Sequence, residues 1–253
     1  MNIVIPLAGL GSRFSNVGYR EPKPLIYFRG KTMIEHAIES IGITGKFIFI
    51  TRLFKQPYHN HLMYVLRQYT DNKNIIVLDQ TTKGSAQTIL HAKELICNFE
   101  PLIQTNCDQI LRWKPQEFLD HLYEQQCHGS VVTIKSNDPK HSYVKLDERF
   151  YATEFAEKNP ISDNALVGMH YWKQGHYFVN AAERMIEENA TQQGEFYVSS
   201  SYNYMLKNFK ENGKPCRISS FNISEQEINF LGTPEDLQNY KDKYNVSTLY
   251  CST

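Results

Sequence analysis

The residues of this chain that could do chemistry gather near its start. Two glycines, Gly9 and Gly11, follow a short apolar run, and two cations, Arg13 and Lys23, stand just after them. Glycines let backbone N–H groups approach an anion closely, and the cations add fixed positive charge. A tight turn with two solvated cations is the simpler interpretation. The arginine and the proline-flanked lysine favour a loop that holds a triphosphate.

Two familiar phosphate-binding motifs do not fit this stretch. The dinucleotide fingerprint requires a small residue where this chain has Phe14, and no acidic residue follows a second strand at the expected distance. Gly30-Lys31-Thr32 is similar to the end of a P-loop, but Leu25 stands where that motif requires a glycine. The loop therefore belongs to neither class.

A second candidate is Asp108, in the segment Asn106-Cys107-Asp108-Gln109 at the end of an expected strand. A carboxylate at the carboxyl end of a strand is well placed to bind a Mg²⁺ ion that bridges phosphate oxygens. An isolated aspartate more often caps a turn or a helix. Because the glycine loop is expected at the same edge, we favour the metal-binding role for Asp108.

These residues require a sheet whose strand ends meet at one edge. In the first half of the chain, strand-like runs alternate with helix-like patterns, which predicts right-handed crossovers and a mostly parallel sheet flanked by helices. The expected strands are Ile3–Leu7, Phe47–Thr51, Ile75–Leu78 and Leu102–Thr105, and the expected helices are Met33–Ser40, His59–Tyr69 and Ser85–Leu95. Ligands of such sheets bind at the carboxyl ends of the strands, where the glycine loop falls.

The second half has a different pattern, in which short β-rich runs predict an antiparallel extension of the sheet. These runs, which follow an expected helix at Gln116–Gln126, are Val131–Ile134, Tyr143–Leu146, Ala152–Ala156 and Leu166–Tyr171. Further helices are expected at Phe178–Asn189, Ser199–Asn208 and Pro234–Tyr244, the last with Thr233 as its cap. No repeat or linker interrupts the chain. We therefore expect an α/β fold with a Rossmann-like mixed, mostly parallel sheet, in a single domain 1–253.

Composition limits the partners. Basic and acidic residues number 27 each, so no global field attracts nucleic acid or an anionic membrane. The five cysteines are widely spaced and form no C-x-x-C pair, which argues against a disulfide framework and against a zinc site. There is no basic-then-apolar leader, and no apolar run reaches ~18 residues. We expect a cytoplasmic protein without membrane insertion, whose ligands are small anions.

The order of the motifs resembles that of the sugar-phosphate nucleotidyltransferases. In that family the pattern reads roughly L-A-A-G-x-G-T/S-R, then P-K-x-L, then G-K-P-M-I, and this chain has Leu7–Arg13, Pro22–Leu25 and Gly30–Ile34. Five further segments similar to family motifs follow in order: Gly84-Ser85-Ala86, Asn106-Cys107-Asp108, Glu157-Lys158-Asn159-Pro160, Gly194-Glu195-Phe196-Tyr197 and Leu231–Leu237. Together they span nearly the whole chain. The variants at Gly18-Tyr19, Asn106–Gln109 and His141–Val144 resemble a branch found in bacterial capsule and surface-polysaccharide gene clusters.

The resemblance implies a Mg²⁺-dependent enzyme that transfers a nucleoside monophosphate from an NTP to a small phosphorylated acceptor and releases pyrophosphate. The acceptor phosphate is already an anion, so no general base is required. Catalysis then depends on positioning and on charge neutralisation. The implied fold is of the nucleotidyltransferase and GT-A type, with residues 1–128 as the nucleotide-binding half and 129–253 as the acceptor-binding half.

Matching positions imply roles for individual residues. Arg13 is expected to hold the β- and γ-phosphates, Lys23 to neutralise the α-phosphate, Asp108 to hold Mg²⁺ and Lys158 to hold the acceptor phosphate. The implied nucleotide-binding residues are Leu7, Ala8, Gly9, Gly11, Ser12, Gln80, Gly84 and Ser85, with Gln80 and Gly84 at the base edge. The other acceptor candidates are Glu157, Glu195 and Tyr143, for which surface exposure of the carboxylates and packing of the tyrosine are the alternatives.

One position departs from the family pattern. Phe230 stands where many members have a second metal-binding aspartate, and the nearest acid is Glu227. Either Asp108 holds the metal together with phosphates and waters, or Glu227 or Asn229 contributes indirectly.

Two other functions stay open at this point. A GT-A-type glycosyltransferase would use a nucleotide-sugar, usually through a D-x-D motif whose first position is Asn106 here, and it would leave Arg13 unexplained. A non-catalytic nucleotide-binding protein would fit the missing second aspartate. For the main hypothesis, the glutamine before Gly84 favours a pyrimidine NTP, with CTP ahead of UTP and dTTP, because an amide can both donate to and accept from that edge. The acceptor can be a sugar phosphate or a non-sugar phosphate.

Overall fold

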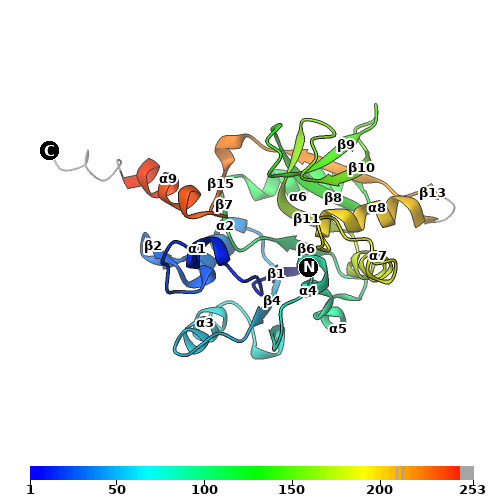
Figure 1. The fold of residues 1–253 in the computed structure, drawn as a ribbon. Coiled ribbons are helices and arrows are strands. Elements are labelled where there is room, and N and C mark those ends of the chain that lie inside the picture. Colours follow the sequence, from blue (N-terminus) through cyan, green and yellow to red (C-terminus); the bar gives the residue numbers. More distant parts are fainter. Residues whose placement is uncertain (209, 212–213, 246–253) are drawn as a thin grey trace.

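The computed structural model describes residues 1–208, 210–211 and 214–245, which form one central nine-stranded sheet with helices on both faces (Figure 1). The strand order is β10-β9-β11-β6-β1-β4-β5, and β8 and β14 continue the sheet from β11. The parallel part consists of β1 (Asn2–Pro6), β4 (Lys46–Arg52), β5 (Ile75–Leu78) and β6 (Leu102–Thr105). This arrangement confirms the predicted mixed, mostly parallel α/β sheet.

The antiparallel extension begins where β11 pairs with β6. Its strands are β8 (Gly129–Lys135), β9 (Ser142–Leu146), β10 (Ala152–Glu157) and β11 (Asn164–Trp172), with β14 (Ile218–Asn222) parallel to β8 at its edge. Three small two-stranded ladders add β2 (Tyr27–Phe28) with β3 (Lys31–Thr32), β7 (Gln109–Leu111) with β15 (Ile228–Phe230), and β12 (Lys210–Glu211) with β13 (Lys214–Pro215).

Alternating side chains of the strands supply two cores. Val4 of β1 packs into the core on one face, and its neighbours Ile3 and Ile5 pack into the core on the other, because successive residues of a strand point to opposite faces. The first core is closed by α4 (Ser85–Leu90), α5 (Lys93–Ile96), α7 (Gly175–Glu187) and α8 (Val198–Asn208). The second is closed by α2 (Met33–Ile41), α3 (Tyr58–Leu66) and α6 (Pro115–Gln125).

The C-terminal helix α9 (Pro234–Asn245) returns to the beginning of the chain. Leu237 and Tyr240 of this helix pack in a third apolar cluster with Phe14 of the short helix α1 (Ser12–Ser15). Thr233 caps α9, since its hydroxyl accepts a hydrogen bond from the Asp236 N–H at 3.1 Å. This contact confirms the predicted cap. The packing of Leu237 and Tyr240 with Phe14 brings the C-terminal motif to the glycine loop.

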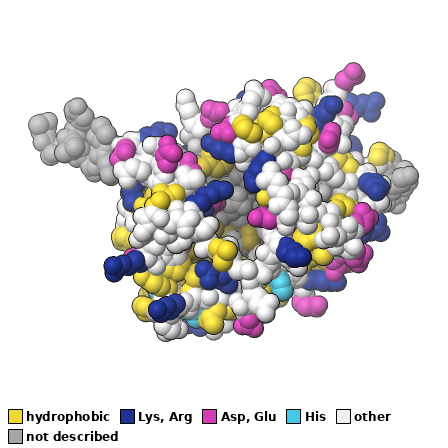
Figure 2. Space-filling model, viewed as in Figure 1, with side chains coloured by type: hydrophobic (Ala, Val, Ile, Leu, Met, Phe, Trp, Pro, Cys, Tyr) yellow, Lys and Arg dark blue, Asp and Glu magenta, His cyan; other side chains and the backbone are white. Residues whose placement is uncertain are grey.

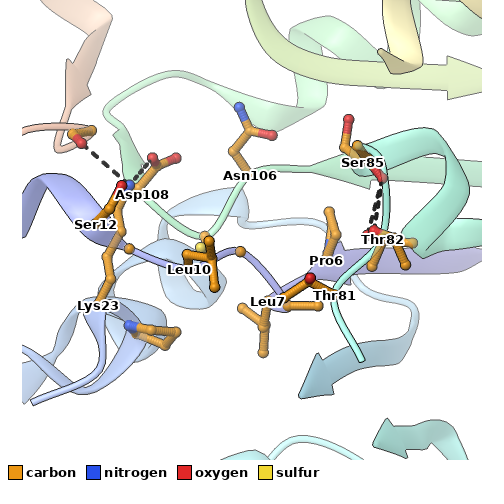
Figure 3. A pocket seen from close by; sticks show the side chains of 18 of the residues that line it. Pro6, Leu7, Leu10, Ser12, Lys23, Thr81, Thr82, Ser85, Asn106 and Asp108 are labelled. Carbon is orange, nitrogen blue, oxygen red and sulfur yellow. Dashed lines mark hydrogen bonds and ion pairs between the residues drawn. The ribbon is translucent and has the colours of Figure 1, made fainter. Parts of the chain in front are cut away.

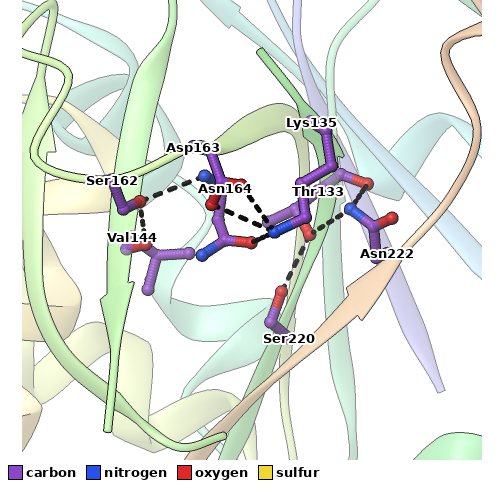
Figure 4. A network of polar contacts seen from close by, with 8 residues as sticks. All are labelled: Thr133, Lys135, Val144, Ser162, Asp163, Asn164, Ser220 and Asn222. Carbon is purple, nitrogen blue, oxygen red and sulfur yellow. Dashed lines mark hydrogen bonds and ion pairs between the residues drawn. The ribbon is translucent and has the colours of Figure 1, made fainter. Parts of the chain in front are cut away.

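Hydroxyl and amide contacts join β14 to the rest of the extension (Figure 4). The hydroxyls of Thr133 and Ser220 lie 2.8 Å apart, and Asn222 Nδ2 donates to the Thr133 carbonyl at 3.3 Å. Nearby, Lys135 pairs with both carboxylate oxygens of Asp163 at 3.0 Å. These polar contacts explain why a strand containing two serines, which the apolar pattern does not predict, joins the sheet.

Other elements differ from the expected bounds. The helix predicted over Ser85–Leu95 is two helices, α4 and α5, and the helix predicted from His59 to Tyr69 ends at Leu66. None of the helices in the described ranges is long and apolar enough to cross a bilayer. The division into two functional halves stays a prediction.

Candidate active site

A cavity of about 530 Å³ opens at the carboxyl ends of β1 and β6, and Figure 2 shows it as a hollow bordered by basic and acidic side chains. Three segments and two single residues, far apart in the sequence, form its wall. They are 6–14 with Lys23 and Pro24, the β5–α4 connection with the start of α4, 106–108 after β6, and the two single residues Glu195 and Gly232.

The first wall is the glycine loop that the sequence singled out. Leu7 N–H donates to the Ile50 carbonyl at 2.6 Å, which continues the sheet to the edge of the cavity. Gly11 then turns the chain with φ +67°, and a side chain there would lie 3.3 Å from Lys23 Cβ. A Cβ atom on Gly9 would have no neighbour within 4 Å, so the loop is open toward the cavity there. The loop can therefore offer backbone donors to an anion.

Lys23 and Asp108 meet across the cavity floor as an ion pair (Figure 3). The Lys23 ammonium also lies 3.4 Å from the carbonyl oxygen of Gly232 and 5.5 Å from the centre of the Phe14 ring. Only 16% of the Lys23 side chain and 24% of the Asp108 side chain are exposed. The structure thus brings together the predicted cation, the predicted carboxylate and the C-terminal motif.

Arg13 is exposed at the same end of the cavity. A side chain on Gly232 would lie 3.6 Å from Asp108 Oδ2 and 4.0 Å from Arg13 Nη1. The guanidinium and the Lys23–Asp108 pair are therefore neighbours. A side chain on Gly232 would also lie 3.7 Å from Asp236 Oδ2, so Arg13 and Lys23 stand beside two carboxylates. The two cations are the groups here that suit the phosphates of a nucleotide.

The opposite wall depends on a close backbone approach at Gly84. A side chain there would lie 2.6 Å from both the N and the O atom of Phe196, and Gly84 has φ +121°. Phe196 N–H donates to the Lys83 carbonyl at 2.7 Å, and Ala86 N–H donates to the Phe196 carbonyl at 3.0 Å. Only glycine permits this contact, which holds the neighbouring Glu195 at the cavity wall.

Gln80 does not lie where the resemblance placed it. Its side chain is exposed and is not part of the cavity lining, which instead contains Thr81, Thr82 and Thr88. The hydroxyls of Thr82 and Thr88 lie 2.6 Å apart, so they hold each other. The sequence alone does not predict these threonines, because single hydroxyl side chains carry no spacing signal.

Glu157 and Lys158 lie beside the cavity and do not line it. Ser142 donates a hydrogen bond to the Glu157 carboxylate, and Ser199 lies within 3.5 Å of it. Burial raises the pKa of Glu157, although these hydroxyls and Lys158 oppose the shift. The Lys158 ammonium donates to Gln193 Oε1 at 3.0 Å and to the Tyr197 hydroxyl at 3.3 Å. Both residues are thus connected to the segment that carries Glu195.

Tyr143 is misplaced as an acceptor ligand. Its side chain is fully buried in the core, and its hydroxyl donates to the Asp138 carbonyl at 2.7 Å. The alternation of β9 turns this residue inward, so it supports the strand and cannot reach a ligand in the cavity.

The donor set fits a Mg²⁺ ion that arrives with a nucleotide. In the described part of the chain, no group of three or more His, Cys, Asp and Glu side chains could hold a metal. Mg²⁺ often binds through one or two carboxylates plus substrate phosphates and waters, and Asp108 supplies one such carboxylate at the cavity. Phe230 packs its ring 5.1 Å from that of His141, and Glu227 accepts a hydrogen bond from Ser224 N–H at 2.8 Å. Asp108 is therefore the carboxylate best placed for this ion.

The chain matches the family model described as Nucleotidyl transferase over residues 3–214. It is 27% identical over 165 residues to mannose-1-phosphate guanylyltransferase 1 of Arabidopsis thaliana, covering 62% of this chain and 45% of that protein. It is 26% identical over 175 residues to the bifunctional protein GlmU of Methanocaldococcus jannaschii, covering 67% of this chain and 39% of that protein. The chain spans less than half the length of these curated relatives.

Two solved structures share the fold. The nucleoside-diphosphate-sugar pyrophosphorylase from Vibrio cholerae RC9 superposes with a TM-score of 0.77 at 24% identity, over 94% of this chain and 98% of that one. The inositol-1-phosphate CTP transferase from T. maritima gives a TM-score of 0.72 at 14% identity, over 100% and 97%. At such identities the likeness concerns the fold alone, whereas the family match covers most of the sequence. This chain belongs to the nucleotidyl transferase family.

Proposed function

We propose that this chain transfers a nucleoside monophosphate from an NTP to the phosphate of a small phosphorylated acceptor and releases pyrophosphate. The observation that carries the proposal is the meeting of Lys23, Asp108 and Gly232 at the floor of a cavity walled by the glycine loop. Cations, backbone donors and one carboxylate are the groups that in-line transfer between phosphates requires.

The nucleotide half of the reaction is assigned to the end of the cavity that holds Lys23 and Arg13. The backbone from Leu7 to Gly11 would hold the phosphates, and Arg13 would hold the β- and γ-phosphates that leave as pyrophosphate. Lys23 would neutralise charge at the α-phosphate. Asp108 would hold Mg²⁺, which supplies further neutralisation of the phosphate oxygens when it is bound. In the free protein the Lys23–Asp108 pair keeps both charges compensated until the substrate enters.

The acceptor half is assigned to the side of Glu195. Lys158 would hold the acceptor phosphate after leaving Gln193 and Tyr197, and Glu157 and Glu195 would accept hydrogen bonds from acceptor hydroxyls. A sugar phosphate or a related phosphorylated alcohol supplies both groups. The motif variants support a role in capsule or surface-polysaccharide precursor synthesis, and the use of an NTP suits the cytoplasm.

A pyrimidine NTP, with CTP favoured, is part of the proposal. Since Gln80 lies outside the cavity, the base edge would meet Thr81, whose hydroxyl can both donate and accept. The T. maritima structure, which is titled a CTP transferase, has the same fold and does not decide the base.

A grid of four NTPs against phosphorylated acceptors, with Mg²⁺ present and pyrophosphate release as the signal, tests the proposal. We expect release with one pyrimidine NTP and one phosphorylated acceptor together, and little with either alone. Hydrolysis of a nucleotide-sugar without NTP turnover would instead indicate a glycosyltransferase. Tight NTP binding without release across the whole grid would indicate a non-catalytic protein.

A further inference from the structure

We propose that Asn106 binds the acceptor by donating a hydrogen bond from its carboxamide to an oxygen atom of the phosphorylated sugar or alcohol. This inference rests on the proposed function and adds a residue that sets acceptor specificity. Asn106 follows β6, lines the cavity, and lies between Asp108 and Ser85 in Figure 3.

The side chain of Asn106 packs against β11. A side chain on Gly168 of that strand would overlap Asn106 Nδ2 and lie 2.9 Å from its Cγ, so the carboxamide occupies the space that any larger residue would fill. Gly168 has φ +76° and lies where the pairing of β11 with β8 shifts register between Leu166 and His170. The strand is therefore shaped to receive this one side chain.

The orientation of the Asn106 side chain indicates that it binds the acceptor and not the NTP. In the sheet, β6 has β1 on one side and β11 on the other. The glycine loop continues from β1, whereas Glu157 and Lys158 come from the extension that begins with β11. A carboxamide packed against Gly168 is turned away from the triphosphate loop and toward the extension.

The hydrogen bonds of the carboxamide leave a donor for the ligand. Gln104, of which 1% is exposed, donates from Nε2 to Asn106 Oδ1 at 3.2 Å. In this arrangement Oδ1 is the acceptor and Nδ2 is the donor. Within the ranges that the structure describes, no protein group accepts a hydrogen bond from Nδ2. A neutral donor suits an uncharged oxygen of the acceptor, because Lys158 would already balance the charge of the acceptor phosphate.

Asn106→Leu keeps the volume and removes the donor. The acceptor is the one that the grid selects from an aldohexose phosphate, an alditol phosphate and glycerol phosphate. We expect its KM to rise by about tenfold or more in Asn106→Leu, because a hydrogen bond to a buried site is lost. The KM for the NTP should stay within about twofold. Gly168→Ala, which displaces the same carboxamide, should give the same selective rise. Asn137→Leu in the exposed turn before β9 is the matched control.

Calorimetric titration of the acceptor into each variant loaded with a non-hydrolysable NTP analogue gives a second measurement, and thermal melting reports whether each variant is folded. An unchanged acceptor affinity in folded Asn106→Leu, or a rise in the KM for the NTP alone, would overturn this inference while wild-type turnover upholds the proposed function. Absence of wild-type turnover with every pair of substrates would overturn both.

Discussion

Among single residues, the proposed activity depends most on the Lys23–Asp108 pair. The two residues are far apart in the sequence, and the structure places them in contact with most of each side chain shielded from solvent. A buried charge that loses its partner is destabilising. Each residue therefore supports the other in the free protein, and in the proposed reaction both would turn to the nucleotide when it enters.

Replacing either member of this pair should abolish turnover. In the proposed roles, Lys23 neutralises the α-phosphate and Asp108 holds the metal. We therefore expect pyrophosphate release to fall by at least about a hundredfold in both Lys23→Ala and Asp108→Ala. Lys31→Ala is the matched control, since Lys31 forms its ion pair with Glu39 on the surface. Normal turnover in folded Lys23→Ala or Asp108→Ala would contradict the assigned roles.

The sequence predicted the cationic end of the site better than its other walls. The family motif at Leu7–Arg13 determines both residue type and local conformation, and Lys23 and Asp108 belong to further motifs of the same family. The sequence therefore predicts the glycine loop, Lys23 and Asp108 together. Gln80 and Tyr143 were misplaced because their orientation depends on how a loop and a strand turn their side chains, which spacing does not encode. For Asn106 the sequence offers only its position two residues before Asp108. Its contact with Gly168 becomes evident only in the structure.

At the scale of elements, the contact between the β5–α4 connection and the segment before α8 holds the two halves of the cavity together. Gly84 lies against the backbone of Phe196, and that backbone makes two hydrogen bonds across the gap. The position of Glu195 thus depends on a glycine that is more than a hundred residues away in the sequence.

Gly84→Ala should therefore reduce both stability and activity. The added methyl group overlaps the Phe196 backbone, and alanine is strained at φ +121°, so we expect a loss of about 1–3 kcal/mol in the free energy of unfolding. Gly9→Ala is the comparison, because open space surrounds that position and stability should hardly change. Chemical denaturation of both variants measures the difference; equal stability of the two would refute the role of this contact.

Apolar patterns in the sequence predict some strands of the sheet and not others. The parallel strands were found from apolar runs because both of their faces are buried. The strand β14 was missed, since its two serines bond to hydroxyls of β8, Ser219 to Ser130 at 3.0 Å and Ser220 to Thr133 at 2.8 Å. A polar strand stabilised by its neighbour gives no apolar signal of its own.

At the scale of the whole molecule, the two cores on either side of the sheet determine stability, and one of them contains a buried imidazole. His170 of β11 stacks on Tyr202 and Trp172 at 5.6 and 6.0 Å between ring centres, and its Nδ1 has no hydrogen-bond partner in the described structure. Burial lowers the pKa of His170 to about 3. The folded protein therefore keeps this ring neutral.

This histidine predicts a loss of stability in acid. In the unfolded chain the pKa of a histidine is about 6.5, so below that pH the unfolded state binds a proton that the folded state does not. The resulting loss begins near pH 6.5, grows toward pH 3, and reaches about 2 kcal/mol at about pH 5. Burial likewise lowers the pKa of His121 and His141, which adds to the same trend.

His170→Phe keeps an aromatic ring in the stack and removes the titration, so the free energy of unfolding should fall less between about pH 7 and pH 5 than in wild type. His91→Phe, at an exposed position, is the matched control. Denaturation curves across this range provide the measurement. The same pH dependence in His170→Phe and wild type would show that the buried ring does not titrate on unfolding.

The central claim is that the bond broken in the NTP lies between the α- and β-phosphates and that the α-phosphate passes to the acceptor. Parallel reactions with NTP labelled at the α-phosphate or at the γ-phosphate test it most directly. We expect the α-label to appear in the acceptor product and the γ-label in pyrophosphate, in equal amounts and only when both substrates are present. Transfer of the γ-label to the acceptor, or release of the γ-label as orthophosphate, would contradict it.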